Sequence, residues 1–136
     1  MGQSGQYNYG RCIARRDTAA AQLAAIEFTR SAMHCIYLLN RAYMPYYKWC
    51  FRGLKNLVIL SRIADDLEYL ISSGNTPDEA SKKAETIENI CSDIAKELTA
   101  QNLLSSSTCE MEQLSYALND TIADSSIRNL NIIYGV

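Results

Sequence analysis

The hydrophobic pattern of residues 17–43 predicts one long helix. This stretch has neither Gly nor Pro and is rich in Ala and Leu, which have the highest helix propensities. Apolar residues recur along it at helical spacing, which predicts that most of its circumference is buried. The positions on this apolar arc are Phe28, Ala32, Cys35 and Leu39, extended by Ile26, Met33 and Tyr37.

A thin polar stripe remains on the same helix. It consists of Glu27, Arg30, His34 and Arg41, at spacings that place neighbours on one face. Such a stripe is either a solvated helix face or a polar seam that lines a cleft. Exposed ion pairs contribute little to stability, so the pattern itself leaves both interpretations open.

Pro45 predicts the end of this helix and the beginning of a second helix over residues 45–60. Proline disfavours helical geometry at Met44 but suits the first turn of a following helix. Lys48, Arg52 and Lys55 then align on one face. That basic stripe fits either contact with phosphate or exposure to solvent.

The rest of the chain is also predicted to be helical. An apolar segment over residues 63–72 stops before Gly74, and Thr76-Pro77-Asp78-Glu79 is a capping box that opens a long helix. Ser107 and Glu110 form a second capping box, and a Ser-rich cap at residues 124–126 precedes a last turn or two over residues 127–134. No segment alternates like a strand. We therefore expect an all-α fold, an up-and-down bundle of about four to five helices.

The segment between the first two predicted helices is rich in aromatic residues. Residues 40–49 contain four aromatic side chains and two cations around Pro45. The aromatic rings either pack two helices together or form a binding site. If they form a site, the second helix turns back beside the first, and both polar stripes border one cleft. The candidate substrate-binding residues are His34, Arg41, Tyr43, Tyr46, Lys48, Trp49 and Arg52.

Composition limits the classes of function. The chain has 136 residues and a net charge of −2, which fits a single domain, 1–136, and argues against a dedicated nucleic-acid binder. A local basic patch is still compatible with this charge. No apolar run is long enough to span a membrane, and the polar first residues do not form a signal peptide. We expect a cytoplasmic protein with no membrane and no nucleic-acid partner.

The residues that usually carry metal or catalytic chemistry are sparse. The five cysteines form no Cys-x-x-Cys pair, and His34 is the sole histidine, so we expect buried free thiols and no metal site. No catalytic triad, phosphate loop or zinc helix is recognisable. Arg30 and His34 resemble the Arg-His pair of helical ribonuclease domains of the nucleotide-binding higher-eukaryote and prokaryote type. Those domains have four intervening residues where this chain has three, so ribonuclease activity is only a minor alternative.

Several segments together resemble one bacterial family of unknown function. They are Ser4-Gly5-Gln6-Tyr7-Asn8-Tyr9, Tyr37-Leu38-Leu39-Asn40-Arg41, Tyr43-Met44-Pro45-Tyr46-Tyr47-Lys48-Trp49 with Phe51-Arg52, and residues 124–135 with Ile127-Arg128-Asn129-Leu130. This family is found carboxy-terminal to a minimal nucleotidyltransferase domain. In related enzymes, such as kanamycin nucleotidyltransferase, the helical domain binds the acceptor and closes over the nucleotide.

The resemblance implies a helical substrate-binding domain whose partner is an N-terminal nucleotidyltransferase domain of the same polypeptide. Catalysis in such enzymes needs a Gly-Ser turn and a spaced acidic pair that holds magnesium, and this chain has neither. We expect an excised C-terminal part that is inactive alone and has no cofactor of its own. The full-length protein is expected to use Mg and a nucleoside triphosphate on an unknown small-molecule acceptor. The alternative is a helical interaction module that forms a homodimer and binds no small molecule.

Overall fold

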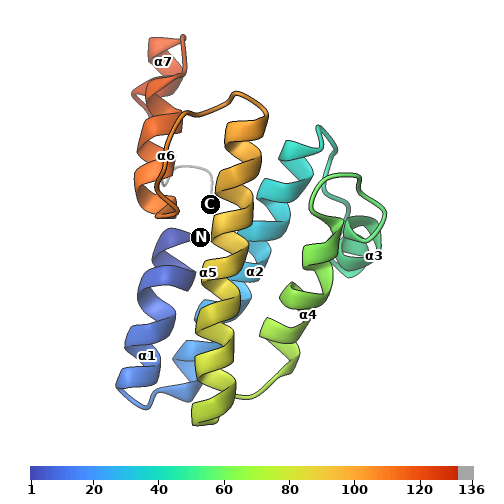
Figure 1. Cartoon of the computed structure of the whole chain (residues 1–136), viewed down its shortest axis with the longest axis vertical. Coiled ribbons are helices and arrows are strands. Elements are labelled where there is room, and N and C mark those ends of the chain that lie inside the picture. The colour runs from blue at the N-terminus through green and yellow to red at the C-terminus, as the bar shows by residue number, and fades with distance from the viewer. Residues whose placement is uncertain (132–136) are drawn as a thin grey trace.

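The computed structural model describes residues 1–131, in which the regular secondary structure is entirely helical (Figure 1). Seven α-helices and three short helical segments of other types follow one another. The all-α prediction is thus confirmed, but more and shorter helices form than the four to five expected. The elements are η1 (Gly2–Tyr9), α1 (Gly10–Ala14), α2 (Thr18–Leu39), η2 (Tyr47–Trp49), α3 (Cys50–Leu54), η3 (Ser61–Ile63), α4 (Ala64–Ser72), α5 (Pro77–Ala100), α6 (Met111–Asp120) and α7 (Ser125–Arg128).

The bundle is built around the two long helices, α2 and α5. Figure 1 shows η1 with α1, α2, α4 and α5 running alternately down and up, while α6 and α7 form an arm above the start of η1. Large apolar side chains from these elements fill the centre with at most 1% of their surface exposed. They include Phe28 and Ile36 of α2, Leu67 and Leu70 of α4, and Ile87, Ile90 and Ile94 of α5.

The first helical segment, residues 2–14, was not predicted from the sequence. It contains three glycines and lacks a clear apolar period, so tertiary contacts hold it. Tyr9 is fully buried. Gly5 lies so close to Phe28 that a Cβ atom there would come within 2.2 Å of the ring. Close approach to the core therefore compensates for the poor helix propensity of glycine.

Helix α2 is shorter than the predicted helix over residues 17–43. Asp17 caps its start, where Oδ1 accepts a hydrogen bond from the Ala20 amide at 3.0 Å, and its last residue is Leu39. Arg41 then adopts a left-handed conformation with φ of 53°. On the apolar arc, Ile26 is 42% exposed rather than buried. The other arc positions are buried except Cys35, which is half-buried.

The predicted helix over residues 45–60 is wrong. Residues 42–46 have no helical structure, and only η2 and the short α3 follow. The side-chain amide of Asn40 explains the loop over residues 55–60, because it donates to the Ile59 carbonyl at 3.0 Å and accepts from the Ile59 amide at 2.9 Å. These bonds hold Ile59 against the end of α2, a position that a continuous helix could not reach.

The helix starts further along the chain differ in outcome. The capping box at Thr76 and Glu79 forms as predicted. The second box does not: α6 begins at Met111, and no side chain of its own caps it. Instead, the side chain of Gln6 accepts a hydrogen bond from the Met111 amide at 2.9 Å. Helix α7 occupies Ser125–Arg128 after the Asp124 cap. Residues 132–134 of the predicted last turns lie outside the described residues.

None of the helices within residues 1–131 combines the length and the apolar character needed to cross a membrane.

Candidate functional site

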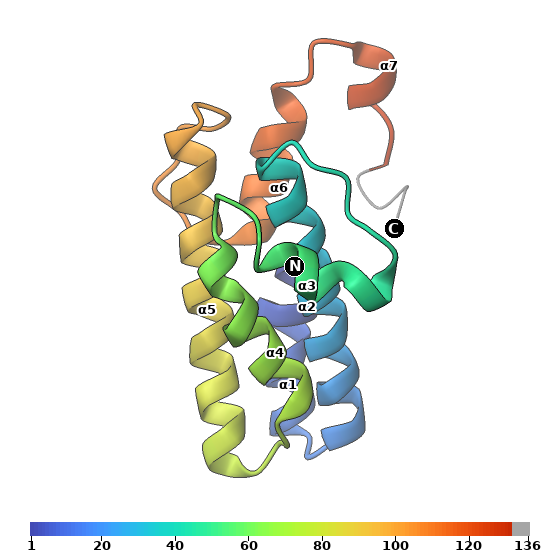
Figure 2. The same ribbon diagram turned by 90° about the vertical axis from the view of Figure 1, so that its right-hand side faces the viewer.

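Two hydrogen bonds fix the aromatic segment between α2 and α3, residues 40–49, which we call the aromatic joint. The hydroxyl of Tyr37 donates to the Cys50 carbonyl at 2.9 Å, and the Cys50 thiol donates to the Pro45 carbonyl at 3.1 Å. Burial raises the pKa of both Tyr37 and Cys50, so both groups keep their protons at neutral pH and act as donors. Figure 2 shows the chain leaving the upper end of α2, descending along the outside of the bundle and turning into α3.

The side chains of the joint point outward rather than into the core. Tyr43 is fully exposed, and Tyr46, Tyr47 and Trp49 are 66%, 73% and 46% exposed. The rings of Tyr46 and Tyr47 lie 4.5 Å apart between centroids. Packing of two helices, the alternative explanation of these aromatics, therefore does not account for their positions.

Two cations accompany the single tryptophan. The Lys48 ammonium lies 5.3 Å from the centroid of the Trp49 ring, and the Arg52 guanidinium lies 5.2 Å from it. Both separations fall within the range of cation–π attraction. The structure thus brings together three of the seven predicted site residues.

The charge around the joint is strongly one-sided. Residues 28–64 contain six Lys and Arg and no Asp or Glu, whereas the other residues contain seven Lys and Arg and all 15 Asp and Glu. Two of the six have acidic partners from later helices: Lys55 pairs with Asp65 and Glu68, and Arg62 pairs with Asp93. Within residues 1–131, the other four have no carboxylate partner. They are Arg30, Arg41, Lys48 and Arg52.

Arg30 extends the basic region down the side of α2, and His34 is a polar side chain one turn further along the helix. Both are exposed. They precede Tyr37 by seven and three residues, so they lie on nearly the same side of the helix as the residue that contacts α3. We call the combined region the basic–aromatic surface. It consists of Arg30, His34, Arg41, Tyr43, Tyr46, Tyr47, Lys48, Trp49 and Arg52.

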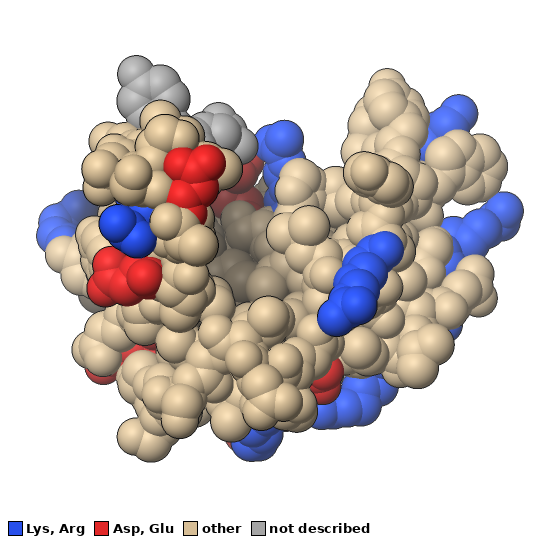
Figure 3. Space-filling model, turned by 90° about the horizontal axis from the view of Figure 1, so that it is seen from above, with Lys and Arg blue, Asp and Glu red and all other residues tan. Residues whose placement is uncertain are grey.

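Seen from above, the right-hand side of the molecule shows several Lys and Arg and little Asp or Glu (Figure 3). Arg30 and Tyr47 were not among the predicted site residues. The run of residues without acidic side chains is the sequence signal that would have included Arg30. Tyr47 lies within the aromatic segment itself.

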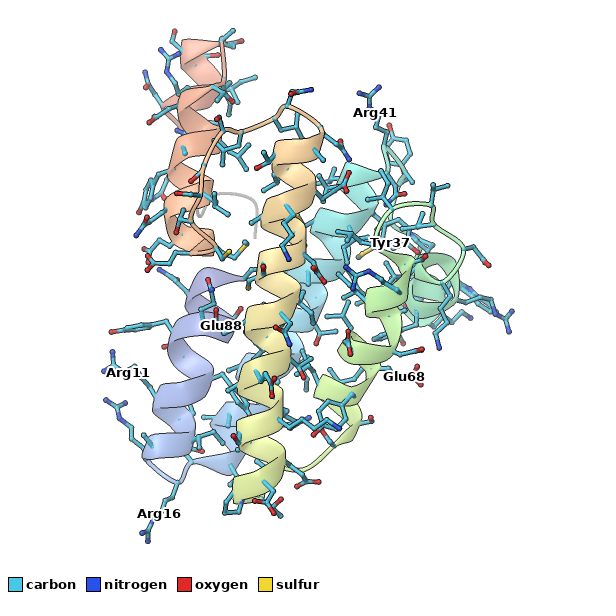
Figure 4. All side chains as sticks on the ribbon, in the orientation of Figure 1. Arg11, Arg16, Tyr37, Arg41, Glu68 and Glu88 are labelled. Carbon is cyan, nitrogen blue, oxygen red and sulfur yellow. The ribbon has the colours of Figure 1, made fainter. Side chains whose placement is uncertain are left out.

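The predicted common cleft has a partial counterpart. Arg41 borders a hollow of about 410 Å³ together with Asn40, Ile59 and Gln101. The other six predicted site residues border neither this hollow nor a second one of about 500 Å³ between η1 and α6. Figure 4 shows Tyr37 between α2 and α3 and Arg41 pointing outward at the upper end of the bundle. All six side chains are exposed and lie outside both hollows.

A buried lysine near the opposite end of the bundle was not singled out from the sequence. Lys83 is completely buried. Its ammonium donates to Gln22 Oε1 at 2.8 Å, the Ser73 carbonyl at 2.9 Å and Asn75 Oδ1 at 3.3 Å. Desolvation lowers its pKa. Because all three donors are used, we assign Lys83 to holding α2, α5 and the loop before α5 together.

The cysteines match their prediction only in part. Cys50 and Cys91 are buried, whereas Cys12, Cys35 and Cys109 are half-buried, and all five are free thiols. Among the described residues, no group of three or more His, Cys, Asp or Glu is placed to hold a metal ion.

Comparison with known proteins gives one result. Residues 1–50 match the model of a family described as Domain of unknown function (DUF4037). No curated protein and no solved structure matches the chain. The matched part runs from η1 through α2 and the aromatic joint to the first residue of α3. It supports the resemblance to a family of unknown function over the segment that carries most of the basic–aromatic surface.

Proposed function

We propose that this chain is the helical accessory domain of a nucleotidyltransferase and that its basic–aromatic surface contacts an anionic substrate. One observation carries the proposal: two cations, Lys48 and Arg52, lie over the exposed Trp49 ring in a segment with three further exposed tyrosine rings, and neither cation has a carboxylate partner within residues 1–131. Aromatic residues and Arg are also enriched in protein–protein interfaces, so composition alone does not identify the ligand. Cations that have no carboxylate partner within residues 1–131 favour a ligand with phosphate groups, and the exposed rings suit one that also has a flat ring.

The division of labour follows from the chemistry of phosphoryl transfer. Metal ions neutralise the charge that develops on the transferred group, and an N-terminal catalytic domain of the same polypeptide would supply the acidic residues that hold Mg. The accessory domain supplies binding and positioning. Its guanidinium groups form charge-assisted bonds to phosphate oxygens, and its rings offer faces to a nucleobase or a ring-containing acceptor.

Trp49 provides a direct test, because it is the single tryptophan in the chain. Adding a magnesium–nucleoside triphosphate should change its fluorescence, and calorimetry should give the affinity independently. Lys48→Ala and Arg52→Ala should each weaken binding by about 1–3 kcal/mol if a desolvated charge-assisted contact is lost. Arg15→Ala, an exposed cation outside the surface, is the matched control. Unchanged affinity in both cation variants would exclude this surface from the substrate site.

The interaction module stays as a second candidate because several apolar side chains are highly exposed. Val58 is 94% exposed and borders the same hollow as Arg41, and Leu38, which is 75% exposed, is three residues before Arg41 in the chain. Such side chains suit a protein interface. Sedimentation equilibrium measures the oligomeric state: a dimer that dissociates in a Leu38→Ser variant favours this candidate. A monomer at high concentration contradicts the homodimer.

A further inference from the structure

We infer that the basic–aromatic surface binds single-stranded nucleic acid. The inference rests on the proposed function and deepens it, because it makes the acceptor the end of a nucleic-acid strand. Three properties of the surface carry it: the spacing of the cations, the exposure of the rings and the charge of the rest of the chain.

The cations do not all lie at one point. Arg30 precedes the end of α2 by nine residues, about 14 Å along its axis, and Arg41 lies beyond that end. Lys48 and Arg52 are on η2 and α3, which pack beside α2 through Tyr37. One triphosphate cannot reach all of these positions at once. A strand can, because its phosphates repeat along its length.

The rings are accessible in the way that unpaired bases require. Tyr43 is fully exposed, and Tyr46 and Tyr47 expose about two thirds or more of their surface. Proteins that bind single strands combine a positively charged track with aromatic side chains on which bases stack. The bases of a duplex are already stacked on one another, so the rings favour the single-stranded form.

The charge of the other residues confines binding to this surface. Outside residues 28–64, the chain has 15 acidic residues against seven Lys and Arg, and this acidic remainder repels a strand. The expectation that nucleic acid is not a partner rested on the net charge of −2 for the whole chain. A net value averages over two regions of opposite sign and so conceals the basic region.

The first experiment measures binding of a fluorescently labelled 12-nucleotide single strand to the full chain by anisotropy, at several salt concentrations. Contact with about four phosphates predicts a slope of log K against log salt of about −3. The double variant Arg41→Gln with Arg52→Gln should reduce the size of this slope by about half. The matched control is Arg15→Gln with Arg16→Gln, which removes two exposed cations outside the surface. Arg16, like Arg41, has a positive φ, so the control also matches the backbone conformation at one replaced position. This control should leave the slope unchanged.

The second experiment separates the rings from the charges. Tyr43→Ala removes a fully exposed ring, so the fold should tolerate it. It should weaken single-strand binding by about tenfold without altering the salt slope. Tyr43→Phe, which keeps a ring, should bind like the original chain. If Tyr43→Ala binds as tightly as the original chain, or a duplex of the same length binds as tightly as the single strand, the inference is overturned.

The outcomes also distinguish this inference from the proposed function. Binding of nucleoside triphosphate through Lys48 and Arg52, with no tighter binding of the 12-nucleotide strand, overturns the inference and leaves the accessory-domain proposal standing. Tight single-strand binding with no affinity for free nucleoside triphosphate supports the inference and contradicts the nucleotide contact. Absence of both overturns both.

Discussion

The thiol of Cys91 lies in the middle of α5 with no exposed surface. Burial raises its pKa from 9.0 to about 12, and burial likewise raises the pKa of Cys35 to about 11. The same cause lowers the pKa of Lys83. At the scale of single residues, desolvation disfavours whichever protonation state is charged.

The contribution of Cys91 to stability should therefore fall in alkali. The Cys91 thiol keeps its proton in the folded state but loses it near pH 9 in the unfolded state. Its contribution is fully present below pH 9 and is lost as the pH rises from 9 towards about 12. Between pH 8 and pH 10, the free energy of unfolding should fall by about 1 kcal/mol less in Cys91→Ala than in the original chain. Urea unfolding at both pH values measures this.

Ile90→Val is the control for this change, because it alters a buried α5 side chain that does not titrate. It should keep the original pH dependence. An equal loss in Cys91→Ala and the original chain would mean that the thiol ionises as readily when folded as when unfolded.

At the scale of elements, the sequence predicts two capping boxes, at Thr76 and at Ser107, but only the first forms in the structure. The Thr76 hydroxyl accepts from the Glu79 amide, and the Glu79 carboxylate accepts from the Thr76 amide at 3.0 Å. Thr76→Ala should lower the free energy of unfolding by about 1 kcal/mol. Ser107→Ala should change it by less than about 0.5 kcal/mol, because Ser107 caps no helix. Thermal or urea unfolding of both variants is the measurement, and equal effects would contradict the assignment.

Two glycines in helices form a second matched pair. At Gly53 in α3, a Cβ atom would lie 2.2 Å from the Tyr37 hydroxyl oxygen, whereas at Gly10 it would meet nothing within 4 Å. Gly53→Ala should destabilise the protein by about 1–3 kcal/mol through overpacking. Gly10→Ala should stabilise it by up to about 1 kcal/mol through helix propensity.

Double-mutant unfolding measurements identify the cause. In a Tyr37→Phe background, which lacks the hydroxyl, Gly53→Ala should cost less than it does in the original chain. An identical cost in both backgrounds would show that Tyr37 is not the obstacle.

At the scale of the whole molecule, the proposal assigns binding to this chain and catalysis to another domain. The described residues form a bundle with one basic–aromatic surface and no cluster of acidic residues placed for a metal. We expect the isolated chain with Mg to leave a labelled nucleoside triphosphate unchanged, because the charge that develops on phosphoryl transfer is not neutralised. Thin-layer separation of the products measures this. Turnover that a point change within this chain abolishes would contradict it.

The sequence predicted those helix ends whose capping residues are close to them in the chain. The start of α5 was predictable because Thr76, Pro77 and Glu79 complete their own capping. The start of α6 was not, because its cap comes from Gln6, which is 105 residues away. That the aromatic segment forms the binding site stays a prediction. The form of this segment as an open surface depends on Asn40 and Tyr37, whose partners are the Ile59 backbone and the Cys50 carbonyl.

The sequence by itself determined the helical class, the two long helices and the position of the basic and aromatic side chains, because these follow from period, propensity and composition. Only the tertiary structure decided where the first helix forms, which lysine is buried and how the joint is exposed. Each of these depends on a contact between distant segments: Gly5 packs against Phe28, Lys83 donates to three oxygens, and Asn40 holds Ile59. Such long-range contacts can outweigh the helix propensity of a short segment, and a pattern within that segment does not contain them.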